Sequence, residues 1–207
     1  MFNSFSPNML KTYQHCPKKF YFRYVKNLNM PTNDEIFETG KNIHALASYY
    51  LKKDYIDKME LSLSNTEKDI WNYLKNISYF KYDTVGTEYN LTVKIDDFFF
   101  GGRLDALVQK DERFYILDYK TGGAPKNAEN DYQTMIYLLA VNAFYKTNNI
   151  SFVYLDLKNK QEFSIDLTEE RISKYKKTLI EIAKNINNED FSKQQTNCHC
   201  EYKIICY

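Results

Sequence analysis

Two carboxylates and a lysine lie on neighbouring segments that the sequence predicts to be strands. Asp105 belongs to the apolar-rich segment 98–109, and Asp118 and Lys120 belong to segment 113–120, which follows after a short turn. Pairing about that turn brings the carboxylates side by side, because adjacent strands are only about 4.8 Å apart. Asp118 and Lys120 are two residues apart, so both side chains leave the same face of their strand. The sequence therefore predicts two acids and one lysine together at one end of a sheet.

Such a group has a recognisable chemistry. Carboxylate oxygens hold Mg²⁺ or Mn²⁺, which keeps coordinated waters and contacts substrate phosphate. The cation lowers the pKa of a bound water, and a lysine can orient or deprotonate that water or stabilise the pentacovalent state. The alternative is a solvated surface, which is the usual fate of an Asp-x-Lys pattern taken alone. The context favours a site, since Asp118 follows the apolar run 114–117, where an unpaired charge needs partners.

The four cysteines form a second group of reactive residues. Cys16 stands near the start of the chain, whereas Cys198, Cys200 and Cys206 crowd its last ten residues. In a cytoplasmic protein such a cluster is more often a metal site than a disulfide framework. Four thiolates bind zinc or an iron–sulfur cluster, and spacing does not choose between the two on physical grounds. A site formed by all four requires the ends of the chain to meet.

Length and composition predict one globular domain over residues 1–207. The chain is 43% hydrophobic and 27% charged, which is ordinary for a protein that buries a core. It has no run of 18 apolar residues and no signal pattern at its start, so we expect a cytoplasmic protein without a membrane span. Lys and Arg (28) nearly equal Asp and Glu (27), so the net charge does not point to nucleic acid.

One stretch near the start is strongly basic. Between Asn8 and Lys26 it has five basic residues and no acidic one, interleaved with five aromatic residues: Lys11, Lys18, Lys19, Arg23 and Lys26 among Tyr13, Phe20, Tyr21, Phe22 and Tyr24. This mixture suits a surface that contacts phosphates and bases. A helix with its rings inward and its lysines solvated gives the same pattern.

Hydrophobic periodicity predicts the elements that position these residues. Segment 7–25 indicates a helix that begins at Ser6-Pro7 and is broken or kinked at Cys16-Pro17. The other predicted helices are 34–53, 66–77, 128–146 and 168–187, and the predicted strands are 85–95, 98–109, 113–120, 150–157 and 161–166. This order predicts an α/β fold in which helices sandwich a sheet.

Four short motifs resemble those of RecB-like nucleases of the PD-(D/E)XK superfamily. They are Gly40-x-x-x-His44, Gly102-Arg103-Leu104-Asp105, Leu117-Asp118-Tyr119-Lys120-Thr121-Gly122 and Gln133-x-x-x-Tyr137. The resemblance implies a restriction-endonuclease-like core with a central mixed sheet flanked by helices.

The same resemblance assigns roles to individual residues. It implies that His44, Asp105 and Asp118 bind Mn²⁺ or Mg²⁺ together with the backbone carbonyl of Tyr119. Lys120 becomes the catalytic lysine beside the two acids, and Gln133 and Tyr137 position DNA or the scissile phosphate. Glu88 resembles an acid that the family often carries on its first core strand, either behind the metal ligands or on the surface.

The cysteine segments carry a resemblance of their own. Cys16-Pro17-Lys18-Lys19-Phe20 and Cys200-Glu201-Tyr202-Lys203-Ile204-Ile205-Cys206 resemble the cluster segments of AddB-type helicase–nucleases and of RecB-like exonucleases associated with CRISPR loci. Those proteins carry a 4Fe–4S cluster, so the likeness implies that Cys16, Cys198, Cys200 and Cys206 bind one and join segments 1–30 and 190–207.

The tail pattern departs from the family in one place. The family usually has two residues between the first pair of tail cysteines, whereas only His199 separates Cys198 from Cys200. A distorted cluster, zinc, or His199 in place of one thiolate are the alternatives that this spacing leaves.

We therefore expect a Mn²⁺- or Mg²⁺-dependent deoxyribonuclease that acts as an exonuclease on single-stranded DNA ends. CRISPR adaptation, where it would trim prespacers beside an integrase, is one setting, and recombination, repair or phage DNA processing is the other. The length leaves no room for a helicase domain, and no Gly-x-x-x-x-Gly-Lys loop is present. The alternatives are a catalytically silent DNA-binding or scaffolding module and a zinc-clasped protein-interaction domain.

Overall fold

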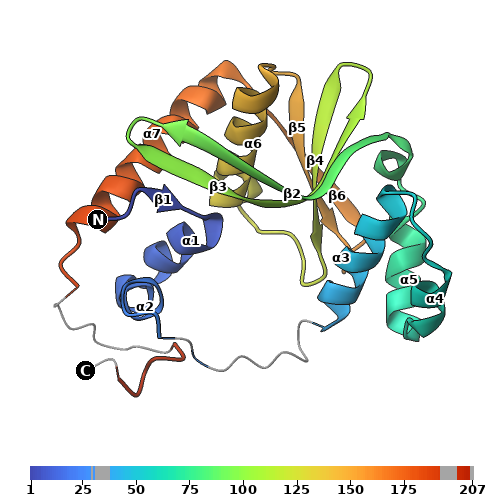
Figure 1. Cartoon of the computed structure of the whole chain (residues 1–207), viewed down its shortest axis with the longest axis horizontal. Coiled ribbons are helices and arrows are strands. Elements are labelled where there is room, and N and C mark those ends of the chain that lie inside the picture. Colours follow the sequence, from blue (N-terminus) through green and yellow to red (C-terminus); the bar gives the residue numbers. More distant parts are fainter. Residues whose placement is uncertain (29, 31–37, 192–199, 206–207) are drawn as a thin grey trace.

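A twisted mixed sheet forms the centre of the molecule (Figure 1). The computed structural model describes residues 1–28, 30, 38–191 and 200–205. Within these residues the strand order is β1-β3-β4-β5-β6, and β2 pairs with the opposite edge of β3. The strands are β1 (Ser4–Phe5), β2 (Asp83–Ile95), β3 (Phe98–Lys110), β4 (Arg113–Lys120), β5 (Ile150–Asp156) and β6 (Gln161–Asp166). Pairing is antiparallel from β2 through β4 and parallel between β4 and β5, which makes the sheet mixed.

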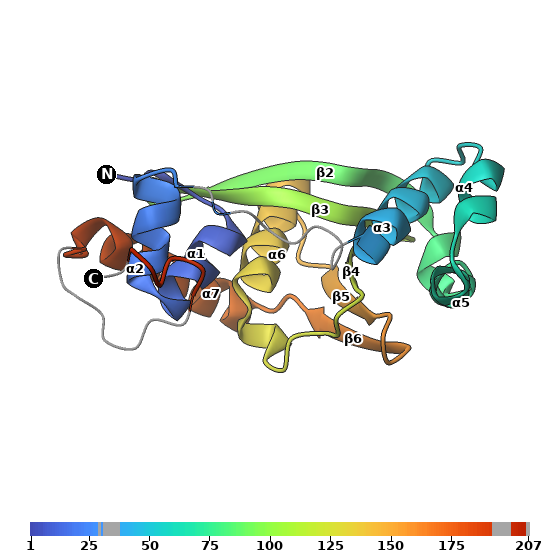
Figure 2. The ribbon, with the colours of Figure 1, turned by 90° about the horizontal axis from the view of Figure 1, so that it is seen from below.

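Helices cover both faces of this sheet, as Figures 1 and 2 show. On one face α6 (Tyr132–Tyr145) and α7 (Glu169–Asn188) pack on side chains such as Ile116. On the other face α3 (Glu38–Leu51) and α5 (Asn65–Leu74) pack on side chains such as Leu117. Successive strand residues point to opposite faces, so one strand supplies both cores. The arrangement is the α/β sandwich that the hydrophobic pattern predicts.

The first two helices begin and end at residues typical of helix ends. Ser6 caps α1 (Pro7–His15), and its Oγ accepts a hydrogen bond from the Met9 amide at 3.3 Å. Cys16 ends α1, and Pro17 begins α2 (Pro17–Phe20), which continues as a π-helical turn η1 (Tyr21–Val25). The predicted break at Cys16-Pro17 is therefore confirmed, because a proline inside a helix removes a backbone donor.

Most of the predicted elements are present with shifted ends. The helix predicted at 34–53 is described from residue 38, and its first four predicted positions lie outside the described residues. The helix predicted at 128–146 begins later, because Asp131 caps it and accepts a hydrogen bond from the Gln133 amide at 2.8 Å. Two short elements, β1 and α4 (Asp57–Ser62), had no periodicity signal long enough to predict them.

One edge of β3 changes its partner along its length. β1 pairs in parallel with Phe99 and Phe100, and β4 pairs with residues 106–110. Between these two ladders, no strand of the described residues pairs with Gly101–Asp105 on that edge, although β2 pairs with the other edge throughout. The interruption leaves backbone groups and side chains of β3 available to other elements.

None of the helices in the described ranges has both the length and the apolar character that crossing a membrane requires.

Candidate active site

Asp105 lies where β3 and β4 diverge. The last paired residues are Ala106 and Leu117, so Asp105 and Tyr119 lie just beyond the end of the ladder. Oδ2 of Asp105 accepts a hydrogen bond from the Tyr119 amide at 2.9 Å. The carboxylate thus takes the place of a strand partner, which fixes its orientation and leaves Oδ1 facing α3.

His44 reaches this point from α3. Its Nδ1 lies 3.3 Å from Oδ1 of Asp105, and its Nε2 lies 3.0 Å from the backbone carbonyl of Tyr119. Burial alone would lower the pKa of the imidazole, but the hydrogen bond and the charge of Asp105 outweigh burial and raise it. The ring therefore lies between two of the oxygen atoms that the family resemblance assigns to a cation.

Asp118 and Lys120 project together toward α6. Asp118 is only 2% exposed, and its Oδ2 lies 2.7 Å from Nζ of Lys120. Gln133 of α6 donates a hydrogen bond to Oδ1 of Asp118 and accepts one from Lys120 at 3.3 Å. Burial raises the pKa of Asp118 to about 6, the charge of Asp105 adds to the rise, and Lys120 opposes it. Despite the nearby ammonium, Oδ2 has no well-directed hydrogen bond among the described residues.

Tyr137 comes from the same helix and contacts the interrupted edge of β3. Its hydroxyl donates a hydrogen bond to the Arg103 carbonyl at 3.0 Å, in the stretch where β4 does not pair with β3. A Cβ on Gly102 would come within 2.7 Å of this hydroxyl, so the approach requires glycine. In this structure Tyr137 therefore supports the backbone beside the site, and a contact with DNA remains a prediction.

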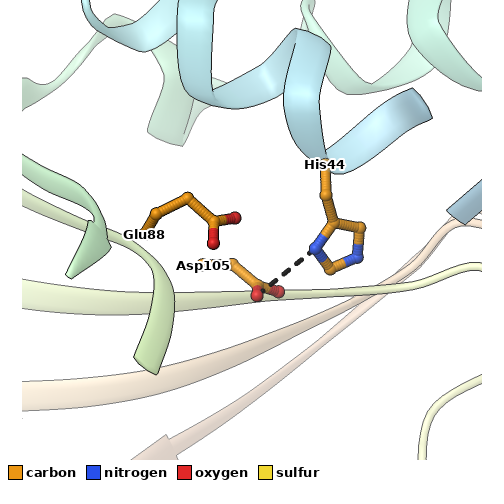
Figure 3. Close-up of side chains that lie close together, drawn as sticks. All are labelled: His44, Glu88 and Asp105. Atoms are coloured by element: carbon orange, nitrogen blue, oxygen red, sulfur yellow. Dashed lines mark ion pairs between the residues drawn. The ribbon is translucent and has the colours of Figure 1, made fainter. Parts of the chain in front are cut away.

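Glu88 joins the cluster from β2. The neighbouring pairs Thr87–Ala106 and Tyr89–Leu104 put Glu88 opposite Asp105. His44, Glu88 and Asp105 each offer one ligand atom, and these atoms lie within 4.8 Å of one another (Figure 3). Sequence reasoning left Glu88 between a supporting group and a surface residue. The register of the predicted hairpin contained the signal that could have placed it.

The donor set fits a divalent cation. His44, Glu88 and Asp105 supply one imidazole nitrogen and two carboxylate oxygens from three separate elements (Figure 3). Imidazole and carboxylate together suit Mn²⁺ and related metals. Asp118 lies outside this group of three, and its buried Oδ2 is paired with the Lys120 ammonium without a well-directed hydrogen bond in the described structure.

The predicted cysteine site lies partly outside the described residues, because Cys198 and Cys206 are not among them. Cys16 is buried, and its Sγ accepts a hydrogen bond from the Lys19 amide at 3.3 Å. Cys200 begins segment 200–205, which lies beside α2 and η1 (Figure 2). The ends of the chain therefore meet, as a site formed by all four cysteines would require.

Side-chain contacts hold this meeting of the chain ends. The rings of Phe22 and Tyr202 stack with centroids 5.5 Å apart, and both side chains are buried. The Tyr202 hydroxyl donates a hydrogen bond to the Leu28 carbonyl, and Lys19 pairs with Glu201 at 2.9 Å. We call residues 16–28 together with 200–205 the terminal junction.

The basic stretch at residues 8–26 is largely engaged within the protein. Phe20 is fully buried in the core, Lys11 pairs with Asp131 at 2.8 Å, and Lys18 donates to the Phe191 carbonyl at 2.8 Å. These contacts favour the packed helix over a nucleic-acid surface for this part of the chain.

Comparison with known proteins gives a consistent result. The family model of the PD-(D/E)XK nuclease superfamily matches residues 4–207. The chain is 23% identical over 204 residues to the CRISPR-associated exonuclease Cas4 of Francisella tularensis subsp. novicida (strain U112), covering 96% of this chain and 91% of the relative. The crystal structure of a candidate exonuclease from Eubacterium rectale has a similar fold, with a TM-score of 0.58 and 9% identity over 98% of this chain and 92% of the other.

Proposed function

The chain belongs to the PD-(D/E)XK nuclease superfamily, and from this premise we propose that it hydrolyses DNA phosphodiester bonds with the help of Mn²⁺ or Mg²⁺. The observation that carries the proposal is the pair of contacts around Tyr119. Its backbone amide and carbonyl contact Asp105 and His44, and its chain neighbours Asp118 and Lys120 pair with each other. Three of these groups are metal-ligand types, and the fourth is a cation suited to a phosphate reaction.

The side chains have distinct roles in this proposal. His44, Asp105 and Asp118 hold the metal with the Tyr119 carbonyl. When bound, a divalent cation supplies Lewis acidity and a lowered water pKa at the scissile phosphate. As an ammonium, Lys120 orients the attacking water by a hydrogen bond to its oxygen and offsets charge on the phosphorane oxygens.

Gln133 prepares Lys120 for this role. Its side-chain amide contacts both Asp118 and Lys120, so it holds the ammonium beside the carboxylate before substrate binds. Preorganised charge costs no reorganisation during the reaction, which is why such groups contribute strongly. Tyr137 supports the backbone two residues before Asp105 in the same way.

In this proposal the protein is an exonuclease that removes nucleotides from single-stranded DNA ends. The similarity to a CRISPR-associated exonuclease over most of both chains supports the exonuclease activity, and the choice of single-stranded ends stays a prediction. In this proposal the protein acts in the cytoplasm in CRISPR adaptation and trims DNA ends for an integrase; the CRISPR association of that relative supports the setting. Recombination or repair is the other setting in which the same chemistry is used.

The four cysteines bind a 4Fe–4S cluster in this proposal, with zinc as the alternative. The contact between the segments of Cys16 and Cys200 supports a site that involves both ends of the chain. Anaerobically purified protein should show a charge-transfer absorption band and contain iron. Cys206→Ala should lose both before it loses activity, and zinc without iron would select the alternative.

Cleavage of end-labelled single- and double-stranded DNA tests the activity. Wild-type protein should produce a ladder with Mn²⁺ or Mg²⁺ and none with a chelator, and the order of products gives the polarity. Lys120→Ala should reduce the rate by about 100- to 1,000-fold or more, as the loss of one charge-stabilising group does, while DNA binding persists. Lys177→Ala, on the exposed face of α7, is the matched control and should cleave normally.

Two results would contradict the proposal. Cleavage that survives Lys120→Ala unchanged would remove the assigned lysine from the reaction. Absence of cleavage by wild-type protein that binds DNA and carries its cluster would favour the silent DNA-binding module.

A further inference from the structure

Charged side chains around the candidate metal site form two separate groups. In the first group, next to α6, the polar atoms mostly bind one another: Asp118 pairs with Lys120, and Gln133 hydrogen-bonds to both. The second group contains His44, Glu88 and Asp105, and its Glu88 forms an ion pair with a side chain outside the group. That outside partner is Arg103, whose Nε lies 2.8 Å from Oε2 of Glu88.

We propose that Glu88 is a ligand of the divalent cation together with His44 and Asp105, and that Arg103 is its counter-ion only in the metal-free enzyme. A cation bound there would take over the charge of Glu88, and the guanidinium of Arg103 would become available to a phosphate of the DNA backbone. This inference rests on the proposed function, because it takes the substrate to be a phosphodiester.

The position of Glu88 in β2 supports its role as a ligand. Glu88 lies opposite Asp105 between two regular pairs of the β2–β3 ladder, and residues opposite each other in a sheet share a face. Its backbone is left-handed, with φ +49°, a conformation that a glutamate in a strand rarely adopts. The result is a carboxylate directed at His44 and Asp105 (Figure 3). The side chain of Glu88 remains 31% exposed, so its carboxylate is accessible to a cation from solvent.

Charge balance supports the exchange of partners. Glu88 and Asp105 bring two negative charges to one point, and Arg103 offsets one of them in the metal-free protein. A divalent cation at the same point offsets both and repels the guanidinium. The pair that must break is weak, because the Arg103 side chain is 65% exposed and exposed ion pairs contribute little.

Arg103 is well placed to receive a phosphate. It precedes Asp105 by two residues on β3, so both side chains leave the same face. Its carbonyl is held by Tyr137, which restrains the backbone while the side chain remains solvent-accessible. A guanidinium binds phosphate oxygens through two parallel hydrogen bonds, a geometry that lysine cannot match.

Calorimetric titration of Mn²⁺ into the full-length protein, with its cysteine cluster intact and no divalent cation bound, tests the ligand assignment without any cleavage. Glu88→Gln keeps the size of the side chain and should weaken Mn²⁺ binding by about 10- to 100-fold, the range seen when a group that supports a metal site is lost. Arg103→Met should tighten it by up to about fivefold, since it removes a weak competing pair. Asp69→Asn breaks an exposed ion pair with Lys160 elsewhere and should change nothing.

The results that overturn the ligand assignment are clear. Glu88→Gln binding Mn²⁺ like the wild type would remove Glu88 from the site, as would a wild type that binds no Mn²⁺. Weaker Mn²⁺ binding by Arg103→Met would contradict the counter-ion role. Circular dichroism and the thermal midpoint of each variant show that it is folded before its titration is interpreted.

Binding of a fluorescent single-stranded 20-nucleotide DNA tests the release of Arg103. The Lys120→Ala background prevents cleavage, and affinity is measured with and without Mn²⁺. Mn²⁺ should strengthen binding in this background, and Arg103→Met should abolish that gain and reduce the salt slope by about one. Lys177→Met is the matched control. An undiminished Mn²⁺ gain in Arg103→Met would overturn the proposed release.

DNA cleavage by the protein and metal binding by Glu88 are tested in different assays. If the proposed function is wrong, DNA incubated with the wild-type protein and Mn²⁺ stays intact. Loss of this inference appears in the Mn²⁺ titration of Glu88→Gln and in the DNA binding of Arg103→Met, neither of which depends on cleavage.

Discussion

The candidate active site and the terminal junction bring distant parts of the chain together in different ways. In the active site, strand pairing positions the backbone, and Asp105 then contacts a residue only 14 positions away. In the terminal junction, Tyr202 and Leu28 are 174 positions apart, and stacked rings, an ion pair and a hydrogen bond are among the contacts that join the described segments. The active site is positioned by a ladder that many residues share, whereas the junction depends on a few side chains.

This difference predicts that the two regions respond differently to mutation. Changes in active-site side chains should alter the chemistry and leave stability largely intact, because the backbone ladder remains. Changes in the junction should lower stability and leave the chemistry of the folded fraction intact.

The largest effect is expected from Asp118→Asn. It should lower DNA cleavage at least about 1,000-fold, since it removes both a metal ligand and the partner of Lys120. The free energy of unfolding should not fall, because the buried carboxylate is replaced by a neutral group of the same shape. Cleavage rates and urea unfolding measure the two quantities, and a variant that is strongly destabilised would break the comparison.

Tyr202→Ala should lower the stability of the protein and leave DNA cleavage by the folded fraction intact. Its ring is 2% exposed and stacked on Phe22, so its loss should lower the free energy of unfolding by about 2–4 kcal/mol. The folded fraction should cleave DNA at the wild-type rate. Tyr55→Ala, at a side chain that is 76% exposed, is the control and should cost less than about 0.5 kcal/mol. A cleavage defect in folded Tyr202→Ala would show that the junction contributes to the chemistry.

The pH dependence of stability should reveal the buried acid in the metal-free protein. The pKa of Asp118 is about 6 in the folded state against an ordinary 3.8, so the unfolded chain loses this proton first as pH rises. The Asp118 carboxyl therefore lowers the free energy of unfolding progressively between about pH 4 and pH 6 and by a constant amount above. Relative to wild type, Asp118→Asn should gain stability across this window in the presence of a chelator. An equal pH profile for the two proteins would contradict the burial of the charge.

The smallest effect is expected at the ion pair of the terminal junction. Burial would raise the pKa of Glu201, but the hydrogen bond and charge of Lys19 outweigh burial and lower it. The pair therefore stabilises the fold above the ordinary glutamate pKa, and its contribution disappears as pH falls through the lowered value. Glu201→Gln should cost less than about 1 kcal/mol at pH 7, because the pair is partly exposed, and 0.5 M salt should reduce the difference. A larger, salt-independent cost would mean that Glu201 does more than pair with Lys19.

Much of the fold could be predicted from the sequence, because its signals are local. Alternating and helical periodicities predicted the long strands and most helices, and Pro17 predicted the break after α1. The proximity of Asp105 to Asp118 also followed from local information, since a short turn joins their strands and sets their pairing. Gln133 and Tyr137 share a helical face for the same reason.

The remainder depends on contacts that short-range patterns do not encode. The partner change along the edge of β3 requires β1, which has only two residues and lies nearly a hundred positions away. The approach of His44 to the Tyr119 carbonyl depends on how α3 packs on the sheet.

The sequence by itself determined which residues could do chemistry and which short elements carry them, because spacing along a helix or strand decides which side chains share a face. Only the tertiary structure decided that α3 brings His44 to Glu88 and Asp105 and that Arg103 pairs with Glu88. It also decided that the two ends of the chain meet at Phe22 and Tyr202. The physical reason is that such contacts arise when whole elements pack against each other, and the energy of that packing is spread over many residues far apart in the chain.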